Sequence, residues 1–342
     1  MTIRFAVKED EGRITAFIKE HWKGNPTLID SPEIFRYQYM TYTECGFVLA
    51  EDKGEIIGIK GYLPLNKMDC PDIAAALAIV VKGSHPMLNM EMQRFLEKGT
   101  NCRMVCSTGL NPNTAARIYP LFRYKVDKLK HYYMLGDCSE YRIASVVHRP
   151  ARHPGGEMEL VELATMEEMQ KRFCAADYAG NMPYKDDAYL QYRYYDHPFY
   201  RYQVYGGAGG DNQITSLLIG REITHNGSNV FRIVDFVGNR GDMPQLGTAL
   251  NGLINTKGYE YIDFYCYGFS HESMCAAGFT LRDENDPNII PNYFEPFVLQ
   301  NIDIVFFCKQ HEDFLICKSD GDQDRPNWMV DPVARKEDSK CF

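Results

Sequence analysis

The chain has 342 residues, of which 45% are hydrophobic and 24% charged, a composition typical of a folded globular protein. This length is too great for one ordinary single-core domain and suits two domains of about 150 residues each. The net charge of −9 and the pI near 5.5 argue against a general nucleic-acid-binding or anionic-membrane-binding surface, but they leave room for a local basic pocket that binds phosphates.

Cysteine usage and the N-terminal sequence predict a cytoplasmic protein. The 11 cysteines show neither zinc-ligand spacing nor a disulfide framework, which favours a reducing compartment. The N-terminus has no apolar segment of signal-peptide length, and no run approaches the roughly 18 apolar residues of a membrane span. We therefore expect no membrane span and no metal.

Residues 1–140 predict one mixed α/β domain. Asp10 is the expected N-cap of the first helix, and Pro32 opens the second. In chain order the expected elements are a strand at 3–7, helices at 11–22 and from 32, strands at 46–50, 56–64 and 73–81, a loop at 82–86, a helix at 88–96, a strand at 102–107, a helix at 115–122 and a closing strand at 126–134.

The stretch Cys102–Tyr124 organises this domain as a buried strand, a turn and a short helix. One face of the helix is apolar at i, i+3, i+4 and i+7 spacing: Ala115, Ile118, Tyr119 and Phe122. Asn111 and Asn113 flank Pro112, which suits an N-cap followed by a first-turn proline. The same pattern of strand, turn and helix returns at residues 259–279.

An ordered internal repeat indicates two homologous domains. Residues 186–194 echo residues 31–39 at an offset of 155, and Gly258 follows Gly99 at an offset of 159. The repeat predicts a first domain at 1–140 and a second domain at 158–318. Between them we expect a linker at 141–157, which is polar and interrupted by proline and glycine, and after them a polar tail at 319–342.

The organising stretch resembles the GNAT superfamily of N-acyltransferases. In that family a strand followed by a helix of the form Asn-x-x-Ala-x-x-x-Tyr-x-x-x-Gly-Phe completes the acyl-CoA site. Ala115 and Tyr119 match this form, and its asparagine falls at Asn111 or Asn113. Arginine and tyrosine stand where the family has Gly-Phe. The resemblance covers the chain apart from the tail, and it implies the α/β (mixed α+β) class with two tandem GNAT-like domains, each a mixed central sheet flanked by helices.

In GNAT proteins the CoA pyrophosphate binds backbone N–H groups at the start of the helix after the fourth strand, where the helix dipole is positive. The corresponding loop at 82–90 has a cation, a glycine and a serine, but lacks the family's paired glycines. The loop at 238–247 is richer in glycine but contains Asp242. Pantetheine would extend the sheet along Ile79–Val81, where the strands splay. The resemblance thus implies acyl-CoA as the co-substrate, held by Ile79, Val80, Val81, Lys82, Gly83, Ser84, His85, Leu88, Asn89, Asn111 and Asn113.

Chemistry favours the first domain as the acyl-CoA site. A tyrosine phenol with a pKa of about 10 can donate a proton to a departing thiolate, and Tyr119 is the candidate acid. At the equivalent position the second domain has Met274, which cannot donate, and Asp242 would repel a pyrophosphate. We therefore expect the second domain to help hold the acceptor.

His131, on the closing strand, is a candidate base facing the cleft, and packing against Tyr132 or Tyr133 is the alternative. Tyrosines concentrate at 189–205 and 259–267, which suits either packing between domains or in a homodimer, or a platform for a nucleotide. The candidate acceptor-binding residues are Arg193, Tyr194, Asp235, Arg240, Tyr265, Tyr267 and His271.

Both halves resemble bacterial sugar N-acyltransferases of surface-polysaccharide pathways, including O-antigen synthesis. That resemblance implies direct transfer of an acyl group from acyl-CoA to the amine of a nucleotide-linked aminodeoxysugar in one ternary complex. Two alternatives stay open. One is acylation of another amine, such as an amino acid, a peptide or an aminoglycoside, and the other is a binding protein whose GNAT folds have lost catalysis.

Overall fold

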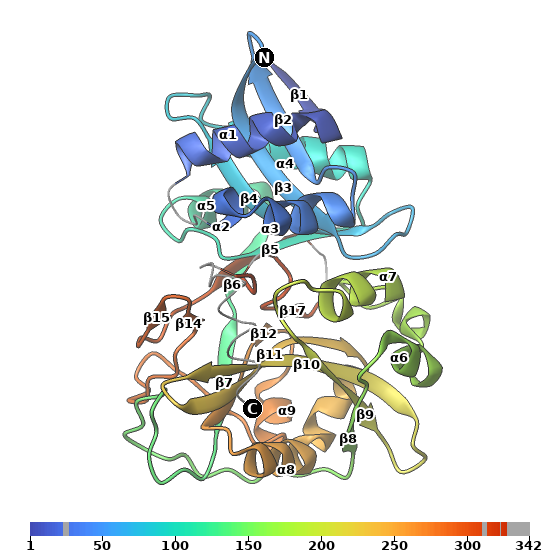
Figure 1. Ribbon diagram of the computed structural model, residues 1–342, viewed down its shortest axis with the longest axis vertical. Helices are drawn as coiled ribbons and strands as arrows, with labels where there is room; N and C mark the ends of the chain where they lie inside the picture. The colour runs from blue at the N-terminus through green and yellow to red at the C-terminus, as the bar shows by residue number, and fades with distance from the viewer. Residues whose placement is uncertain (23–26, 310–312, 322, 327–342) are drawn as a thin grey trace. The chain divides into compact units, whose positions relative to one another are not determined.

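A computed structural model describes residues 1–22, 27–309, 313–321 and 323–326, which belong to two compact units (Figure 1). Among the described residues, unit 1 consists of Met1–Leu63, Ala75–Asn101 and 325–326, and unit 2 consists of Pro64–Ala74 and Cys102–Asp324. Strand β4 (Asp72–Val80) begins in unit 2 and ends in unit 1. The boundaries of these units do not follow the two halves of the sequence repeat.

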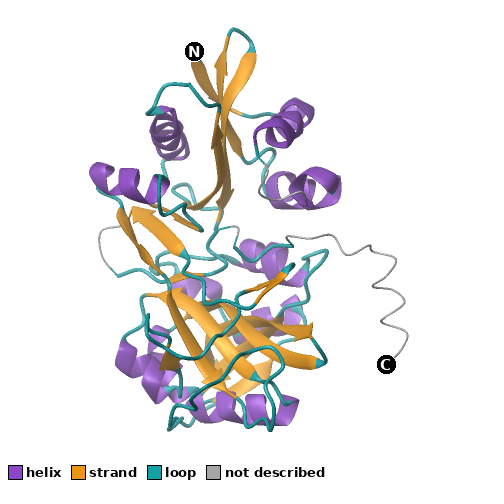
Figure 2. Ribbon diagram, turned by 90° about the vertical axis from the view of Figure 1, so that its left-hand side faces the viewer, coloured by secondary structure: helices purple, strands orange, loops and turns teal. Residues whose placement is uncertain are grey.

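In unit 1, helices lie on both sides of a sheet with the strand order β1-β2-β3-β4 (Figure 2). The strands are β1 (Thr2–Phe5), β2 (Phe47–Asp52), β3 (Glu55–Pro64) and the end of β4. The helices are α1 (Glu11–His21), α2 (Thr27–Asp30), α3 (Pro32–Arg36) and α4 (Leu88–Thr100), with a 3₁₀ turn, η1 (Lys8–Asp10), before α1 and a π-helical turn, η2 (Tyr37–Thr41), after α3.

The core of unit 1 forms where the helices cover the sheet. The first four residues of β2, 47–50, are fully buried, as expected of a strand that is covered on both faces. Helix α4 turns Leu88, Met92 and Leu96 inward at the four-residue spacing of one helix face. Gly58 on β3 makes room for this helix, because a Cβ there would lie 3.1 Å from the Met92 methyl carbon.

Unit 2 contains strands of two larger sheets and a small hairpin. In one sheet the start of β4 is followed by β5 (Met104–Thr108), β16 (Val305–Lys309) and β6 (Lys125–Lys128). The other sheet has the order β13-β7-β12-β11-β10-β9-β8, and β17 pairs with β12. Its strands are β7 (Lys130–Leu135), β8 (Glu159–Glu162), β9 (Gln203–Ala208), β10 (Ile214–His225), β11 (Ser228–Gly238), β12 (Tyr261–Tyr267), β13 (Thr280–Leu281) and β17 (Ile316–Cys317), and the hairpin is β14 (Tyr293–Phe294) with β15 (Phe297–Val298).

The helical segments of unit 2 are short. They are α5 (Ala115–Ile118), η3 (Tyr119–Phe122), α6 (Met166–Arg172), η4 (Ala175–Tyr178), α7 (Asp187–Leu190), η5 (Gln191–Tyr195), η6 (Arg240–Gln245), α8 (Gly247–Lys257) and α9 (His271–Ala276). Leu250 and Ile254 of α8 and Met274 of α9 pack against one face of the larger sheet.

Two strands are exchanged between the halves of the sequence. β16, from the second half, lies between β5 and β6 of the first half and is antiparallel to both. In the opposite direction, β7 pairs with β12 and β13 of the second half. The prediction of one closing strand at 126–134 was therefore wrong: the chain forms two strands there that belong to different sheets.

β7 is central in its sheet, and its side chains alternate between two buried faces. Tyr132 and Met134 pack in the cluster beneath α8, whereas Tyr133 and Leu135 pack in a second cluster on the other face. An apolar run without polar alternation is the expected sequence of a strand that is covered on both sides.

The sequence repeat recurs as local structure. Ser31 caps α3 by accepting a hydrogen bond from the Ile34 amide, and Asp186, which lies 155 residues later, caps α7 by accepting one from the Tyr189 amide. Both helices continue directly into a five-residue π-helical turn, η2 in the first half and η5 in the second.

Three local predictions differ from the structure. Asp10 does not cap α1 through its side chain, because its carboxylate binds Arg4 and the Val7 amide instead. The helix predicted at 115–122 is α-helical only as far as Ile118 and continues as a 3₁₀ turn. Its N-cap is Thr114, whereas Asn111 accepts a hydrogen bond from the Asn113 amide.

The segments predicted as linker and tail are held in place where the structure describes them. The Glu260 carboxylate, itself buried, accepts backbone hydrogen bonds from Arg142, Ile143 and Ala144 within the predicted linker. In the predicted tail, Ser319 and Asp320 are buried, and residues 327–342 lie outside the described residues.

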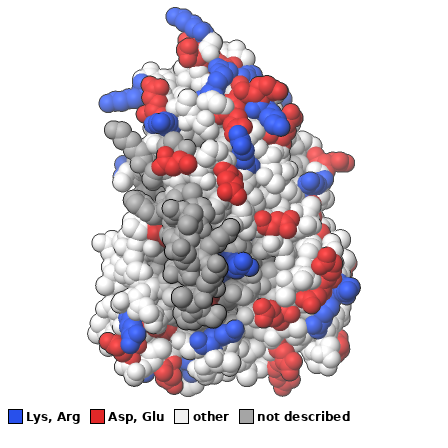
Figure 3. Space-filling model, viewed as in Figure 1, with Lys and Arg blue, Asp and Glu red and all other residues white. Residues whose placement is uncertain are grey.

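The expected mixed α/β class, with mixed sheets flanked by helices, is confirmed. Among the described residues, no helix is long and apolar enough to cross a membrane. On the face of the molecule that Figure 3 shows, Lys and Arg side chains are interspersed with Asp and Glu side chains.

Candidate functional site

The first candidate site lies in unit 1, where β4 ends and α4 begins. The Val81 amide still bonds to the Ile57 carbonyl, and the chain then turns through Gly83, whose φ of +93° favours glycine. The N-cap of α4 is Met87, which provides no side-chain cap. The first amide of α4, that of Leu88, bonds to the His85 carbonyl over 3.0 Å, and the first turn contains Glu91, which lies 3.5 Å from His85 Nδ1. The next amides have no acceptor within the helix, so this end of α4 offers donors and a positive dipole to an anion.

Lys60 is a buried cation at this helix start, and sequence reasoning missed it. It lies on β3 with 1% exposure, and its Nζ donates to Asn89 Oδ1 over 3.1 Å. Asn89 is in the first turn of α4 and was a predicted cofactor residue. The available signal was a lone lysine within the otherwise apolar run Ile59–Tyr62.

The other predicted cofactor residues of unit 1 surround the same turn. Lys82, Gly83 and His85 are exposed, whereas Ile79 and Leu88 are buried and can contribute only backbone groups. His85 is part of the turn, because its Nδ1 accepts a hydrogen bond from the Met87 amide over 3.3 Å. Val80, Val81 and Ser84 are partly exposed.

In the second half, the equivalent helix start is closed by the chain itself. The Gly155 carbonyl accepts a hydrogen bond from the Thr248 amide, in the first turn of α8, over 2.9 Å. The fit is tight, since a Cβ at Gly247 would lie 2.7 Å from the Gly155 oxygen. Asp242 is buried nearby and binds the Thr215 hydroxyl over 2.6 Å. This end of α8 therefore already has its acceptor, and the adjoining loop contains a carboxylate.

The cleft between β11 and β12 is also filled by the chain. These parallel strands pair only from Phe231 to Ile233 and then separate. β17 enters the gap, pairing antiparallel with the end of β12. Just after β17, the Ser319 amide bonds to the Val234 carbonyl of β11, and the Lys318 amide bonds to the Tyr265 carbonyl of β12, both over 3.1 Å. Residues 316–319 thus hydrogen-bond to both separated strands.

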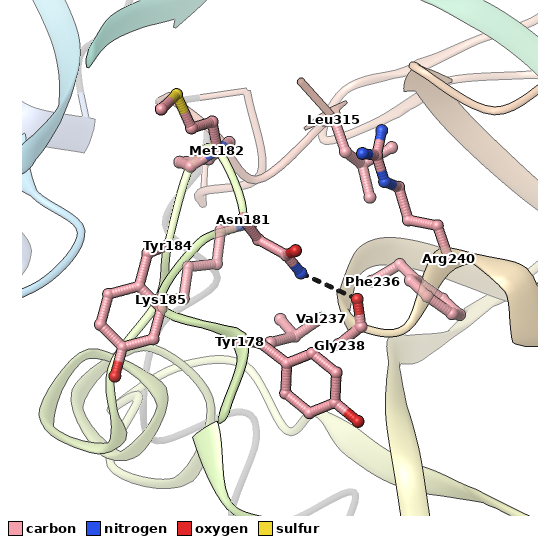
Figure 4. Close-up of a pocket in the computed structure, with 11 residues that line it drawn as sticks. Tyr178, Asn181, Met182, Tyr184, Lys185, Phe236, Val237, Gly238, Arg240 and Leu315 are labelled. Carbon is pink, nitrogen blue, oxygen red and sulfur yellow. Dashed lines mark hydrogen bonds between the residues drawn. The ribbon is translucent and has the colours of Figure 1, made fainter. Parts of the chain in front are cut away.

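A pocket of about 390 Å³, including the solvent at its mouth, remains beside the filled cleft (Figure 4). Asn181 spans it, donating from Nδ2 to the Gly238 carbonyl over 2.8 Å. Its wall consists of the segment before α7, the end of β11 and two further side chains: Tyr178, Asn181, Met182, Pro183, Tyr184, Lys185, Phe236, Val237, Gly238, Arg240 and Leu315.

Two solved structures resemble this chain over most of its length. One, from Enterococcus faecalis V583, is described as a conserved protein of unknown function and probable N-acyltransferase; it is 12% identical, with a TM-score of 0.54, over 90% of this chain and 72% of that chain. The other, a GCN5-related N-acetyltransferase from Anabaena variabilis ATCC 29413, is 10% identical, with the same TM-score and the same coverage. The fold is that of the GCN5-related N-acetyltransferases. No family model and no curated protein matches the sequence.

Within this GNAT fold, Tyr119 belongs to unit 2 and is 2% exposed. Its ring stacks on Phe307 of β16 with 4.1 Å between ring centroids, and it meets Tyr124 edge-on at 5.0 Å. Asn111 and Asn113, predicted to bind the cofactor, are exposed in the preceding turn.

His131 is enclosed in a polar network inside unit 2. Its Nε2 lies 3.0 Å from Asp263 Oδ2, its Nδ1 accepts from Arg282 Nε over 3.2 Å, and its ring stacks on Tyr265. Burial lowers the pKa of His131 to about 4, despite the neighbouring Asp263 carboxylate. Both ring nitrogens are engaged and the side chain is inaccessible, which favours the packing alternative, although the ring partner is Tyr265.

Asp263 is the centre of this network. Arg232 donates to both of its oxygens, over 3.0 and 2.7 Å, and also to the carbonyl of Asn292. All of these groups are buried, so the network joins β7, β11 and β12 to the loop before the β14–β15 hairpin. Its role is therefore to pack the sheet.

Three of the predicted acceptor-binding residues meet at Tyr194, because the Arg193 guanidinium lies 6.0 Å from the centre of the Tyr194 ring and Asp235 binds the Tyr194 hydroxyl. The Tyr194 hydroxyl donates to the Asp235 carboxylate and lies 3.0 Å from the Ser319 hydroxyl. Lys185, which sequence reasoning missed, places its Nζ 2.5 Å from Asp235 Oδ1 and 2.7 Å from Asp320 Oδ1. Asp235, Cys317 and Asp320 could offer three ligand atoms to a metal ion, but the Lys185 ammonium already lies against both carboxylates.

The predicted acceptor-binding residues are otherwise spread over unit 2. Arg193 donates to the Asp324 carbonyl over 2.6 Å, and Tyr265 donates to the Ile302 carbonyl over 3.0 Å. Tyr267 stacks on Phe314, and His271 contacts Cys275 on the short helix α9. Among them, only Arg240 lines the pocket.

Proposed function

We propose that this protein is an acyl-CoA-dependent N-acyltransferase that binds one CoA, in the first half of the chain. The GNAT fold supports the reaction class, because its splayed parallel strands and following helix suit an extended thioester cofactor with a pyrophosphate at the helix start. The acceptor that the sequence resemblance suggests is the amine of a nucleotide-linked aminodeoxysugar.

The observation that carries the choice of half is the state of the two helix starts, together with the filled cleft between β11 and β12. In the second half, residues 316–319 bond to both separated strands, and the Gly155 carbonyl caps the helix start. A CoA molecule would have to displace both. In the first half, α4 has no side-chain cap, and the buried Lys60 reaches its first turn. The Leu88 amide already bonds to the His85 carbonyl, and the ammonium together with the next amides of the first turn favours a pyrophosphate, which is doubly anionic.

The proposed chemistry is direct transfer. The amine lone pair attacks the thioester carbonyl carbon, the C–S bond breaks, and the thiolate takes a proton while the new ammonium loses one to solvent. Tyr119 is the proposed proton donor on the ground of its place in the family pattern. His131 is not part of the proposed site, because its nitrogens are already bonded and it is buried.

Calorimetric titration with acetyl-CoA tests the cofactor assignment. We expect one site per chain, and we expect Lys60→Met to weaken CoA binding by roughly tenfold to a hundredfold through the loss of a charged group. Lys98→Met, at an exposed position near the other end of α4, is the matched control and should leave the affinity unchanged. Two sites per chain, or equal effects of the two variants, would contradict the assignment.

Turnover tests the reaction itself. Release of free CoA is measured with a panel of nucleotide-linked aminosugars, free aminosugars and amino acids. CoA release that depends on the amine, with a matching mass increase of the amine, identifies the enzyme and its acceptor. CoA binding without turnover on any amine would favour a binding protein that has lost catalysis.

A further inference from the structure

Two cationic residues, Lys185 and Arg240, line the pocket of unit 2. Lys185 is 3% exposed and lines the pocket, with its Nζ 2.5 Å from Asp235 Oδ1 and 2.7 Å from Asp320 Oδ1. Arg240 enters from the opposite side in Figure 4. Tyr178 and Tyr184 belong to the same wall, and in Figure 4 their hydroxyls point away from Arg240. None of the residues that line the pocket carries a carboxylate.

Arg240 is available to a ligand. Among the described residues its one ion pair is with Asp313, with Nη2 2.5 Å from Oδ2, and the Asp313 side chain is 80% exposed. Exposed ion pairs contribute little, because water and salt screen them and both side chains lose freedom. A ligand anion can therefore replace or share this partner at little cost. A guanidinium also matches the two oxygens of a carboxylate or phosphate.

The cluster behind the pocket holds Lys185 in place. Asp235 also accepts from the Phe236 amide over 2.8 Å and from Tyr194, and Asp320 accepts from the Cys317 amide over 2.7 Å. The two carboxylates offset the lysine charge, so the charge that attracts an anionic ligand is chiefly that of Arg240.

The wall of the pocket is fixed to the strands of the first half. The Tyr184 amide donates to Asp72, the first residue of β4, over 2.7 Å. Arg103, just before β5, also binds Asp72 and donates to the carbonyls of Ala179 and Asn181 over 2.7 and 2.8 Å. A ligand in this pocket therefore touches a segment anchored where β4 and β5 pair.

We propose that this pocket binds the acceptor by an anionic group, a carboxylate or a phosphate, held between Lys185 and Arg240 with Tyr178 and Phe236 against its apolar part. The proposal rests on the proposed function in one respect, namely that the ligand is the acyl acceptor. It narrows the acceptor to amines that carry such an anion, of which a nucleotide-linked aminosugar and an amino acid are two sources.

Binding without CoA tests the pocket independently of turnover. Glucosamine 6-phosphate, glutamate and inorganic phosphate are titrated into the full chain, with glucosamine, which has no anionic group, as the reference. We expect at least one anionic amine to bind more tightly than glucosamine and to be weakened about tenfold to a hundredfold by Arg240→Gln. Arg142→Gln is the matched control, because Arg142 also forms an exposed ion pair, with Glu140, but does not line the pocket.

Comparing the titrated ligands shows which kind of anionic amine the pocket prefers. A preference for the phosphate ester points to a phosphorylated sugar, and a preference for glutamate points to an amino acid; either supports the proposal. Equal binding of amines with and without an anionic group, or equal effects of Arg240→Gln and Arg142→Gln, would overturn it. If anionic amines bind in this Arg240-dependent way but no amine is acylated, the pocket proposal stands and the proposed transferase function fails.

Discussion

Replacing His131 with glutamine decides between a structural and a catalytic role for this residue. Because burial lowers its pKa from 6.5 to about 4, the unfolded chain takes up a proton near pH 6.5 that the folded chain does not accept until about pH 4. The folded state must therefore lose stability as the pH falls through this window. From these two pKa values, the loss between pH 7 and pH 5 is about 2 kcal/mol.

Urea unfolding at pH 7 and pH 5 measures this loss. We expect the wild-type protein to lose about 2 kcal/mol more than His131→Gln between the two pH values, since glutamine does not titrate. At pH 7 the variant should be less stable than the wild-type protein, because Arg282 and Asp263 lose their hydrogen bonds to the imidazole ring. His148→Gln, at an exposed position, is the control and should keep the wild-type difference.

Turnover completes the test. Removing a general base typically costs about 100- to 10,000-fold in rate, whereas a packing residue should cost less than about tenfold once the protein is folded. A folded His131→Gln protein that retains the wild-type loss of stability, or whose kcat falls by more than about a hundredfold, would refute the structural assignment.

Three further outcomes are expected. Tyr119→Phe should lower kcat by about tenfold to several hundredfold at nearly constant CoA affinity; unchanged kcat with rate-limiting chemistry would leave Tyr119 as the stacking partner of Phe307. Asp72→Asn should lower the free energy of unfolding, measured in urea, by about 2–3 kcal/mol, because the partly buried Arg103 loses its charged partner. Asp127→Asn, which removes an exposed ion pair with Lys125, is the control, and an equal loss in the two variants would contradict this reasoning. Gly155→Pro should lower the free energy of unfolding, because proline cannot donate the hydrogen bond that the Gly155 amide makes to the Ala276 carbonyl. It should not create a second CoA site, because β17 still fills the cleft between β11 and β12. A second CoA site in this variant would show that β17 does not close the cleft.

Local patterns in the sequence were enough to predict most secondary structure of the first half and the fold class. They also predicted the repeat that places a capped helix and a tyrosine-rich turn in each half. These features depend on residues close together in the chain, such as Ser31 with Ile34. The strand exchange could not be predicted, because the register that pairs Cys308 with Cys106 joins residues about two hundred positions apart and leaves no local periodicity.

Long-range contacts also explain why part of the candidate site could not be predicted. The loop at 82–87 and Arg240 could be nominated from composition and family pattern, but their neighbours Lys60 and Lys185 could not. A lone lysine in an apolar strand looks like an edge position in the sequence, and only the packing shows that Lys60 is buried. His131 was nominated for its residue type, and its enclosure by Arg282 and Asp263 depends on long-range contacts.

The place of β16 between β5 and β6 has a consequence for how the chain is made. β5 is complete when residue 108 has been added, but its partner starts only at Val305. At about 5–20 residues per second, a ribosome needs on the order of 10 to 40 s to reach it. Throughout that time the buried strand β5 presents an unpaired edge, which is a template for association with other chains. A nascent chain of this protein should therefore depend on a chaperone that covers β5 until the last ninth of the sequence emerges.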